Sequence, residues 1–198
     1  NIYTKVFCYT YDANGSNSGH VRVYQNVGGV WNQIGDDIDG EAAGDRSGHS
    51  VSLSSDGSIV AIGAPGENST RVFQNLDGTW TQMGSDIHGS SRSYAGTSVS
   101  LSSDGLVLAI GAPFSNPMTA GNKIGNVRVY QYQGDNWSQI GSQINGQSFD
   151  SRSGFSVSLS SDGKKVAIGA KYNDPNLVKG NVRVFENIGG AWTQIGSD

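Results

Sequence analysis

Serine and apolar residues alternate in a stretch that occurs three times, and each time a continuous apolar run follows. In residues 50–65, Val51 and Leu53 alternate with serines at 50, 52 and 54, which is the two-residue period of a β-strand. The Ser-Asp-Gly at 55–57 predicts a tight turn, and the apolar run at 59–64 predicts a strand covered on both faces. The pattern returns at residues 98–113 and 156–171. A single hairpin is not stable alone, so we expect the copies to bury one another.

Two further strands complete each repeat. The third predicted strand carries an arginine between apolar residues, and the fourth begins with a tryptophan after a short turn. The arginines are Arg22, Arg71, Arg128 and Arg183, and the tryptophans are Trp31, Trp80, Trp137 and Trp192. The tryptophans lie 49, 57 and 55 residues apart, and we expect them in the core of the repeats.

Four short antiparallel strands in about fifty residues, repeated along a chain, are typical of a β-propeller blade. The predicted fold class is therefore all-β, a β-propeller of four-stranded antiparallel blades; a β-solenoid is the alternative, although its rungs are usually shorter. We expect one repeat domain over residues 1–198. It has an incomplete blade at 1–36 and full blades at 47–86, 95–143 and 153–198.

The first unit lacks an innermost strand, because Lys5-Val-Phe-Cys-Tyr-Thr10 aligns with Lys165-Val-Ala-Ile-Gly-Ala170, the second strand of a repeat. The chain is thus expected to be a segment of a larger propeller or a subunit completed by another copy. An unpaired edge promotes association. We therefore predict self-association or pairing with further propeller repeats.

Composition narrows the class of partner. The net charge is −4 and the arginines are spread rather than clustered, so nucleic-acid binding is not expected. The sequence has no apolar run long enough to span a membrane. With a single cysteine, Cys8, no internal disulfide can form, while the Ser/Asn/Gly-rich, lysine-poor composition favours an extracellular or cell-surface location.

Short motifs in the repeats resemble a known family. Gly48-His-Ser-Val51 followed by Ile62-Gly-Ala-Pro65 is similar to the FG-GAP repeat, the blade unit of the integrin α-subunit propeller. The match recurs twice, at residues 96–113 and 154–170. Blades of that family often carry a calcium loop between their first two strands. Here a single aspartate in a four-residue turn takes its place and offers too few oxygens for Ca²⁺. This departure from the family pattern predicts that the calcium site of the family is absent.

Few residues suggest chemistry. Asp12, Asn14 and Ser16 place oxygens at alternate positions and form a candidate Ca²⁺ loop, with a polar connecting loop as the alternative. The acidic stretch at 36–45 is a second candidate for a cation, although later repeats lose most of its carboxylates. His20, His49 and His88 have no metal-ligand spacing, and no nucleophile or phosphate-binding motif is present. We therefore predict that the chain is not an enzyme and needs no cofactor.

Three sequons, at Asn14, Asn68 and Asn136, are candidate glycosylation sites, about as many as chance would produce in so Asn/Ser-rich a chain. The functional hypothesis from sequence is a non-enzymatic extracellular propeller with a structural or adhesive role, which would bind an extracellular protein or further blades. The alternative is a lectin-like propeller that binds a glycan through tryptophan or tyrosine. A catalytic propeller is disfavoured, because the expected inner strands present serines and apolar residues.

Overall fold

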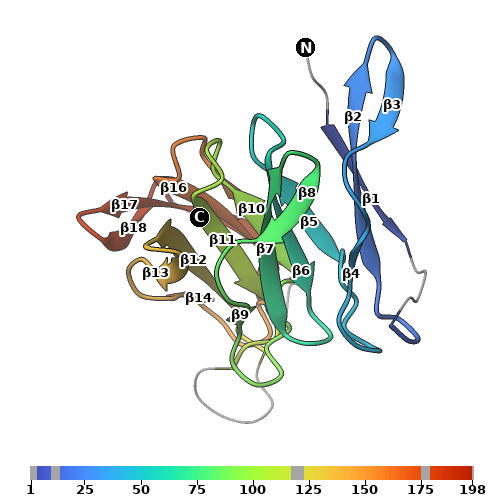
Figure 1. The fold of residues 1–198 in the computed structure, drawn as a ribbon. Helices are drawn as coiled ribbons and strands as arrows, with labels where there is room; N and C mark the ends of the chain where they lie inside the picture. The colour runs from blue at the N-terminus through green and yellow to red at the C-terminus, as the bar shows by residue number, and fades with distance from the viewer. Residues whose placement is uncertain (1–3, 10–13, 117–122, 175–178, 198) are drawn as a thin grey trace.

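The structure is a computed structural model, and it describes residues 4–9, 14–116, 123–174 and 179–197. The described residues form β-strands, turns and bends and contain no helix. Four antiparallel sheets follow one another along the chain, from β1–β3 in blue to β16–β18 in red (Figure 1). We call them blades 1 to 4. The all-β propeller of four-stranded blades expected from the sequence is confirmed.

The strands of the four blades are short. Blade 1 has β1 (Thr4–Tyr9), β2 (His20–Val27), β3 (Val30–Gln33) and β4 (Ile38–Asp39). Blade 2 has β5 (Ser50–Leu53), β6 (Ile59–Ala64), β7 (Ser69–Leu76), β8 (Thr79–Gln82) and β9 (Ile87–His88). Blade 3 has β10 (Ser98–Leu101), β11 (Val107–Ala112), β12 (Asn126–Gln133), β13 (Asn136–Gln139) and β14 (Ile144–Asn145). Blade 4 has β15 (Ser153–Leu159), β16 (Lys165–Asp174), β17 (Lys179–Ile188) and β18 (Ala191–Ile195).

The pairing register is the same in every blade. The arginine of the third strand lies opposite the same position of the second strand: Phe7↔Arg22, Ile62↔Arg71, Ile110↔Arg128 and Ile168↔Arg183. This register identifies β1 as the second strand of its blade, as the sequence alignment predicted. Among the described residues no strand pairs with the other edge of β1, so blade 1 is the incomplete one.

The core lies between blades rather than within them. All six residues of β6 and all six of β11 are buried, as expected for strands covered on both faces. Blades 1 and 2 share a cluster that includes Val21, Val23 and Ile62. Two further clusters join blade 2 to blade 3 and blade 3 to blade 4. Each blade therefore depends on its neighbour for the burial of its apolar side chains.

The serines of the alternating pattern connect neighbouring blades. The Ser50 hydroxyl donates to the Gly96 carbonyl at 2.8 Å, and the Leu101 amide donates to the Ser52 hydroxyl at 2.9 Å. Ser98 and Ser100 make the equivalent bonds to blade 4. Because β10 contacts both β5 and β15, these hydroxyls satisfy polar groups at the innermost part of each blade interface.

The turn between the first two strands has its own polar network. In blade 2 the Ser54 hydroxyl donates to an Asp56 carboxylate oxygen at 2.6 Å and accepts from the Ile59 amide at 2.9 Å. Asp104 and Asp162 repeat this arrangement with Ser102 and Ser160. The serine hydroxyl and the backbone amide that donate to each carboxylate hold the pKa of Asp56, Asp104 and Asp162 below the usual value.

These three carboxylates predict acid sensitivity. A lowered carboxyl pKa contributes stability that is fully present above the unfolded-state pKa, about 4, and is lost as the pH falls through the folded-state pKa. We expect the urea midpoint to be constant from about pH 7 to 5 and to fall below about pH 4. In the double variant Asp56→Asn, Asp104→Asn the fall should be smaller, because two of the carboxylates no longer titrate. An equal fall in both proteins would contradict the assignment.

Candidate functional site

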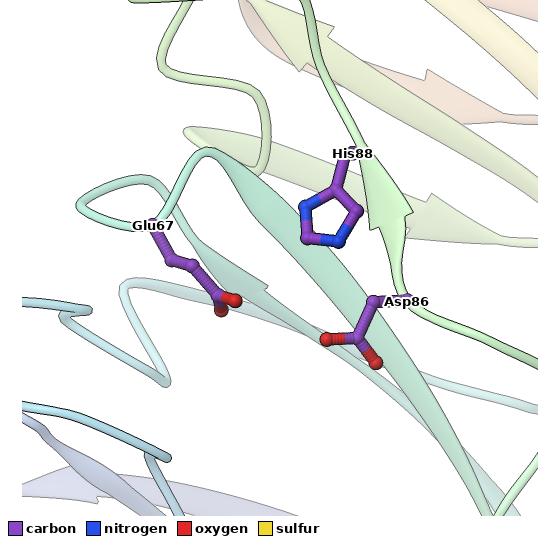
Figure 2. A group of neighbouring side chains, drawn as sticks. All are labelled: Glu67, Asp86 and His88. Atoms are coloured by element: carbon purple, nitrogen blue, oxygen red, sulfur yellow. The ribbon is translucent and has the colours of Figure 1, made fainter.

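Three side chains with metal-binding groups meet at the loop end of blade 2. Strand β9 pairs with the start of β7, in the register Ser69↔His88 and Thr70↔Ile87. Asp86 and His88 are two residues apart, so they lie on the same side of this segment. Glu67, in the loop between β6 and β7, lies two residues before Ser69. Figure 2 shows the three side chains pointing toward one another, and one ligand atom of each lies within 4.8 Å of the others.

Hydrogen bonds orient the two carboxylates. The Ser69 hydroxyl donates to Oε2 of Glu67 at 2.8 Å, and Nε2 of Gln82 donates to Oδ1 of Asp86 at 2.7 Å. Each bond occupies one oxygen and leaves the other available. Both acids are partly buried, whereas His88 is exposed. The group is thus held by its own blade and open to solvent on one side.

The charge of these carboxylates is not balanced by the arginine of their blade. In blade 1 the equivalent aspartate, Asp37, accepts from Nε and Nη2 of Arg22 at 2.8 and 2.7 Å, and this bond lowers the pKa of Asp37. Arg71 of blade 2 turns instead toward blade 1. It donates to the Asp39 carbonyl at 2.6 Å and lies 3.3 Å from the Glu41 carboxylate. The Asp86 carboxylate is therefore not paired with the arginine of its own blade.

Whether the arginine of the third strand bonds the preceding blade or its own blade correlates with the aromatic residue two positions later. Arg71 and Arg183 precede Phe73 and Phe185, lie over those rings at 5.4 and 5.1 Å, and donate to a carbonyl of the preceding blade. Arg22 and Arg128 precede tyrosines, and each bonds a side chain of its own blade at the position of Asp37 or Gln143. These bonds give the four arginines a structural role, pairing with acceptors in their own blade or in the preceding one.

The Ca²⁺ loop proposed from sequence has one member, Asp12, outside the described residues. Nδ2 of Asn14 donates to the Gly40 carbonyl at 2.8 Å, and the Ser16 hydroxyl accepts from Asn17 at 3.3 Å. Both side chains thus bond protein atoms.

In the acidic stretch at 36–45, Glu41 lies near Arg71, and Asp45 accepts from the Ala42 amide at 2.7 Å. Together with the Arg22–Asp37 pair, these contacts give three carboxylates of the stretch, those of Asp37, Glu41 and Asp45, a partner within the protein.

The sequon asparagines differ in their surroundings. Asn68 has a positive φ of 69°. Its side-chain Oδ1 accepts from the Ser93 hydroxyl and the Ala95 backbone amide, and its side-chain Nδ2 donates to the Ser90 carbonyl. A glycan on Asn68 would compete with these bonds. Asn136 is exposed, and its side chain accepts from the Trp137 amide at 2.9 Å.

The tryptophans form one series along the blade interfaces. Nε1 of Trp80, Trp137 and Trp192 donates to the carbonyl of Ile34, Met83 and Ile140, respectively, in the preceding blade, at 2.8 to 2.9 Å. Trp31 of blade 1 is 43% exposed, whereas Trp137 is 8% exposed.

Sequence reasoning missed the Glu67–Asp86–His88 group. The spacing of the histidines from one another gives no sign of it, because the neighbours of His88 in the group are an acid two residues earlier and an acid in another loop. The available signal was the Asp-x-His at 86–88 together with an acidic residue just before the third strand of the same repeat. Only the pairing of β9 with β7 joins the two.

No protein-family model and no curated protein sequence matches the chain. Solved structures do match. A candidate 6-phosphogluconolactonase from Bacteroides uniformis has a TM-score of 0.59 and 15% identity, over 90% of this chain and 48% of that one. A second candidate 6-phosphogluconolactonase, from Bacteroides fragilis, has a TM-score of 0.54 and 16% identity, over 89% of this chain and 50% of that one. TolB from Acinetobacter baumannii has a TM-score of 0.53 and 12% identity, over 96% of this chain and 41% of that one.

These matches correct the functional hypothesis from sequence. The expected structural or adhesive role, and the lectin-like alternative, are wrong: the matched propellers are candidate lactonases and TolB, and nothing in them points to adhesion. Within the described residues no helix is long and apolar enough to cross a membrane. The chain spans about half the length of the structures it matches. At 12–16% identity these structures establish the fold alone, so the conclusion they support is that the chain folds as blades of a β-propeller.

Proposed function

We propose that the chain is a propeller unit that binds a divalent transition-metal ion, with Zn²⁺ preferred, through Glu67, Asp86 and His88. The observation that carries the proposal is the convergence of three ligand atoms within 4.8 Å from two separate segments of blade 2, the β6–β7 loop and residues 86–88. Two carboxylates and a neutral imidazole carry a net charge of −2, which suits a divalent cation. Hydrogen bonds from Ser69 and Gln82 orient the acids, as the outer partners of metal ligands commonly do.

The ligand types favour a transition metal over Ca²⁺. Calcium takes six or more oxygen ligands, whereas imidazole with carboxylates is a usual set for Zn²⁺. Three protein ligands leave a fourth tetrahedral position to water or to another molecule. Because His88 is exposed, that position would face solvent. The proposal is one of binding, not catalysis, in keeping with the expectation that the chain is not an enzyme.

The finer assignment of the repeat also belongs to this proposal. We propose that the blades are of the FG-GAP type, supported by the positions of the motif glycines. Gly96, just before β10, and Gly154, the second residue of β15, have positive φ. A Cβ on Gly63 or Gly111 of the preceding blade would lie 2.1 Å from the carbonyl oxygen of Gly96 or Gly154, respectively. An extracellular location stays a prediction from composition.

Isothermal titration calorimetry tests the metal site. We expect the purified chain to bind Zn²⁺ at pH 7 with a Kd of about 10 μM or lower. Asp86→Asn and His88→Ala should each weaken binding by about tenfold or more, because each removes a direct ligand. The Asn side chain keeps the hydrogen bond from Gln82, so the loop should remain folded.

The matched control is Asp37→Asn, at the equivalent position of blade 1. Arg22 already pairs with Asp37, so this change should leave the Zn²⁺ affinity unaltered. Binding that is equally strong in wild type and in the Asp86→Asn, His88→Ala double variant would contradict the proposal, as would tighter binding of Ca²⁺ than of Zn²⁺.

A further inference from the structure

Adjacent blades are joined by two kinds of contact, and both repeat from one interface to the next. At the outer strand, a tryptophan donates to a carbonyl of the preceding blade, and the glycine after that carbonyl lies against the same ring. At the inner strands, a serine hydroxyl donates to the carbonyl of a positive-φ glycine in the following blade. The faces of blades 1, 2 and 3 therefore each present an outer acceptor to the next blade, and the faces of blades 2 and 3 also present an inner donor.

Blade 4 presents the same outer groups, and no described residue covers them. Ile195 corresponds to Ile34, Met83 and Ile140, and a Cβ added at the following glycine, Gly196, would meet no atom within 4 Å. Val182 is 61% exposed. Its counterparts in the other blades, Val21, Thr70 and Val127, are each 0% exposed because the following blade covers them.

The inner half of this face is also open. A Cβ on Gly63 or Gly111 would meet a serine hydroxyl of its own blade and also a glycine carbonyl of the next blade. A Cβ on Gly169 would meet only Ser156, which belongs to its own blade. Phe155, Ser156, Gly169, Gly180 and Val182 line a hollow at this place. Phe155 is 45% exposed. We call Gly96 and Gly154, the glycines whose carbonyls contact the preceding blade, linker glycines. The hollow on blade 4 is at the place that Gly96 occupies on blade 2 and Gly154 occupies on blade 3.

We propose that this face of blade 4 docks one further complete blade of the same repeat. That blade would place the carbonyl of its linker glycine on Gly169 and Ser156, and the indole of its fourth-strand tryptophan on the Ile195 carbonyl. The argument is continuity with the established blade interface. A second copy of the chain fits less well: its blade 1 offers the exposed Trp31, but among the described residues it has no strand inside β1 to bring a linker glycine.

A repeat-addition experiment tests the proposal. Residues 196–198 repeat the Gly-Ser-Asp of 84–86, so a copy of residues 87–141 can be joined directly after Asp198 in the natural register. The variant Val182→Asp is then made in both the 198-residue chain and the extended chain. The exposed Val27, 59% exposed at the hairpin turn of blade 1, provides the control Val27→Asp.

In the 198-residue chain we expect Val182→Asp to change the melting temperature by less than about 1 °C, since the side chain is already exposed. In the extended chain it should lower the melting temperature by about 5 °C or more, because the carboxylate would be buried against the added blade. Val27→Asp should have no such effect in either. Backbone amides of β15 and β16 should also exchange more slowly with deuterium in the extended chain than in the original one.

Equal effects of Val182→Asp in the two chains would overturn the proposal. An unchanged rate of amide exchange in β15 and β16 would overturn it as well, and this outcome is also expected if the added repeat does not fold. Size-exclusion chromatography with light scattering tests whether a second copy of the chain occupies this face. A dimer of the 198-residue chain that Val182→Asp dissociates would show that a second copy occupies the face, and would equally overturn it.

Discussion

Replacing Trp137 with alanine is expected to lower the free energy of unfolding by about 3–5 kcal/mol, the range for truncating a buried large aromatic side chain. The ring is 8% exposed in the cluster between blades 2 and 3, and it lies 5.3 Å from the ring of Tyr132. The substitution removes this packing and leaves the Met83 carbonyl without the indole donor. Urea denaturation followed by far-UV circular dichroism measures the change.

Trp31→Ala provides the matched control. Trp31 occupies the same place in blade 1, but it is 43% exposed. Its loss should therefore cost about 1 kcal/mol or less. If both alanine variants were destabilised equally, the tryptophans would be stabilising their own blades, and the idea that they hold neighbouring blades together would be wrong.

The second large effect is expected for Gly111→Ala, at about 3 kcal/mol. A Cβ on Gly111 would lie 2.1 Å from the Gly154 carbonyl oxygen and 2.2 Å from the Ser98 hydroxyl. The backbone there does not need a positive φ, so the cost arises from the close approach of the Gly154 carbonyl of blade 4 and of the Ser98 hydroxyl of the same blade. Overpacking of this kind typically costs 1–3 kcal/mol, and a backbone carbonyl yields less than a flexible side chain.

Gly169→Ala is the control, because Gly169 has the same place in blade 4 and a Cβ there would meet only Ser156. The serine hydroxyl can rotate away, so the expected cost is below about 1 kcal/mol. The difference between the two variants, measured by urea denaturation, reports the contact between blades. Equal costs would show that alanine disfavours the strand itself at this position.

Much of the fold could be predicted from the sequence because its signals are local. Alternation in residues 50–54, the Ser-Asp-Gly turn and the apolar run after it each depend on a few neighbouring residues, and all three recur. Recurrence also identified β1 as a second strand, which the register Phe7↔Arg22 confirms. The burial of β6 on both faces followed from the absence of polar residues at alternate positions.

The candidate site could not be predicted in this way, because its geometry depends on segments that are brought together only by folding. Glu67 and His88 are 21 residues apart, and the short β7–β9 pairing brings them close. Whether Asp86 is paired with an arginine depends on the acceptor that Arg71 bonds, and Arg71 bonds the Asp39 carbonyl of the preceding sheet. The sequence of either blade alone contains the same arginine and aspartate.

The sequence by itself determined the four repeats, the order of strands within each, and the pattern of residues that bury one blade against the next. These depend on periodicity and turn chemistry, which act over a few residues. Only the tertiary structure decided which polar groups meet across blades: Ser50 bonds Gly96, and Arg71 bonds Asp39 rather than Asp86. It also decided that Val182 is exposed whereas Val127 is buried. Contacts between blades depend on the packing of whole sheets, and the same local sequence occurs on both a covered and an uncovered face.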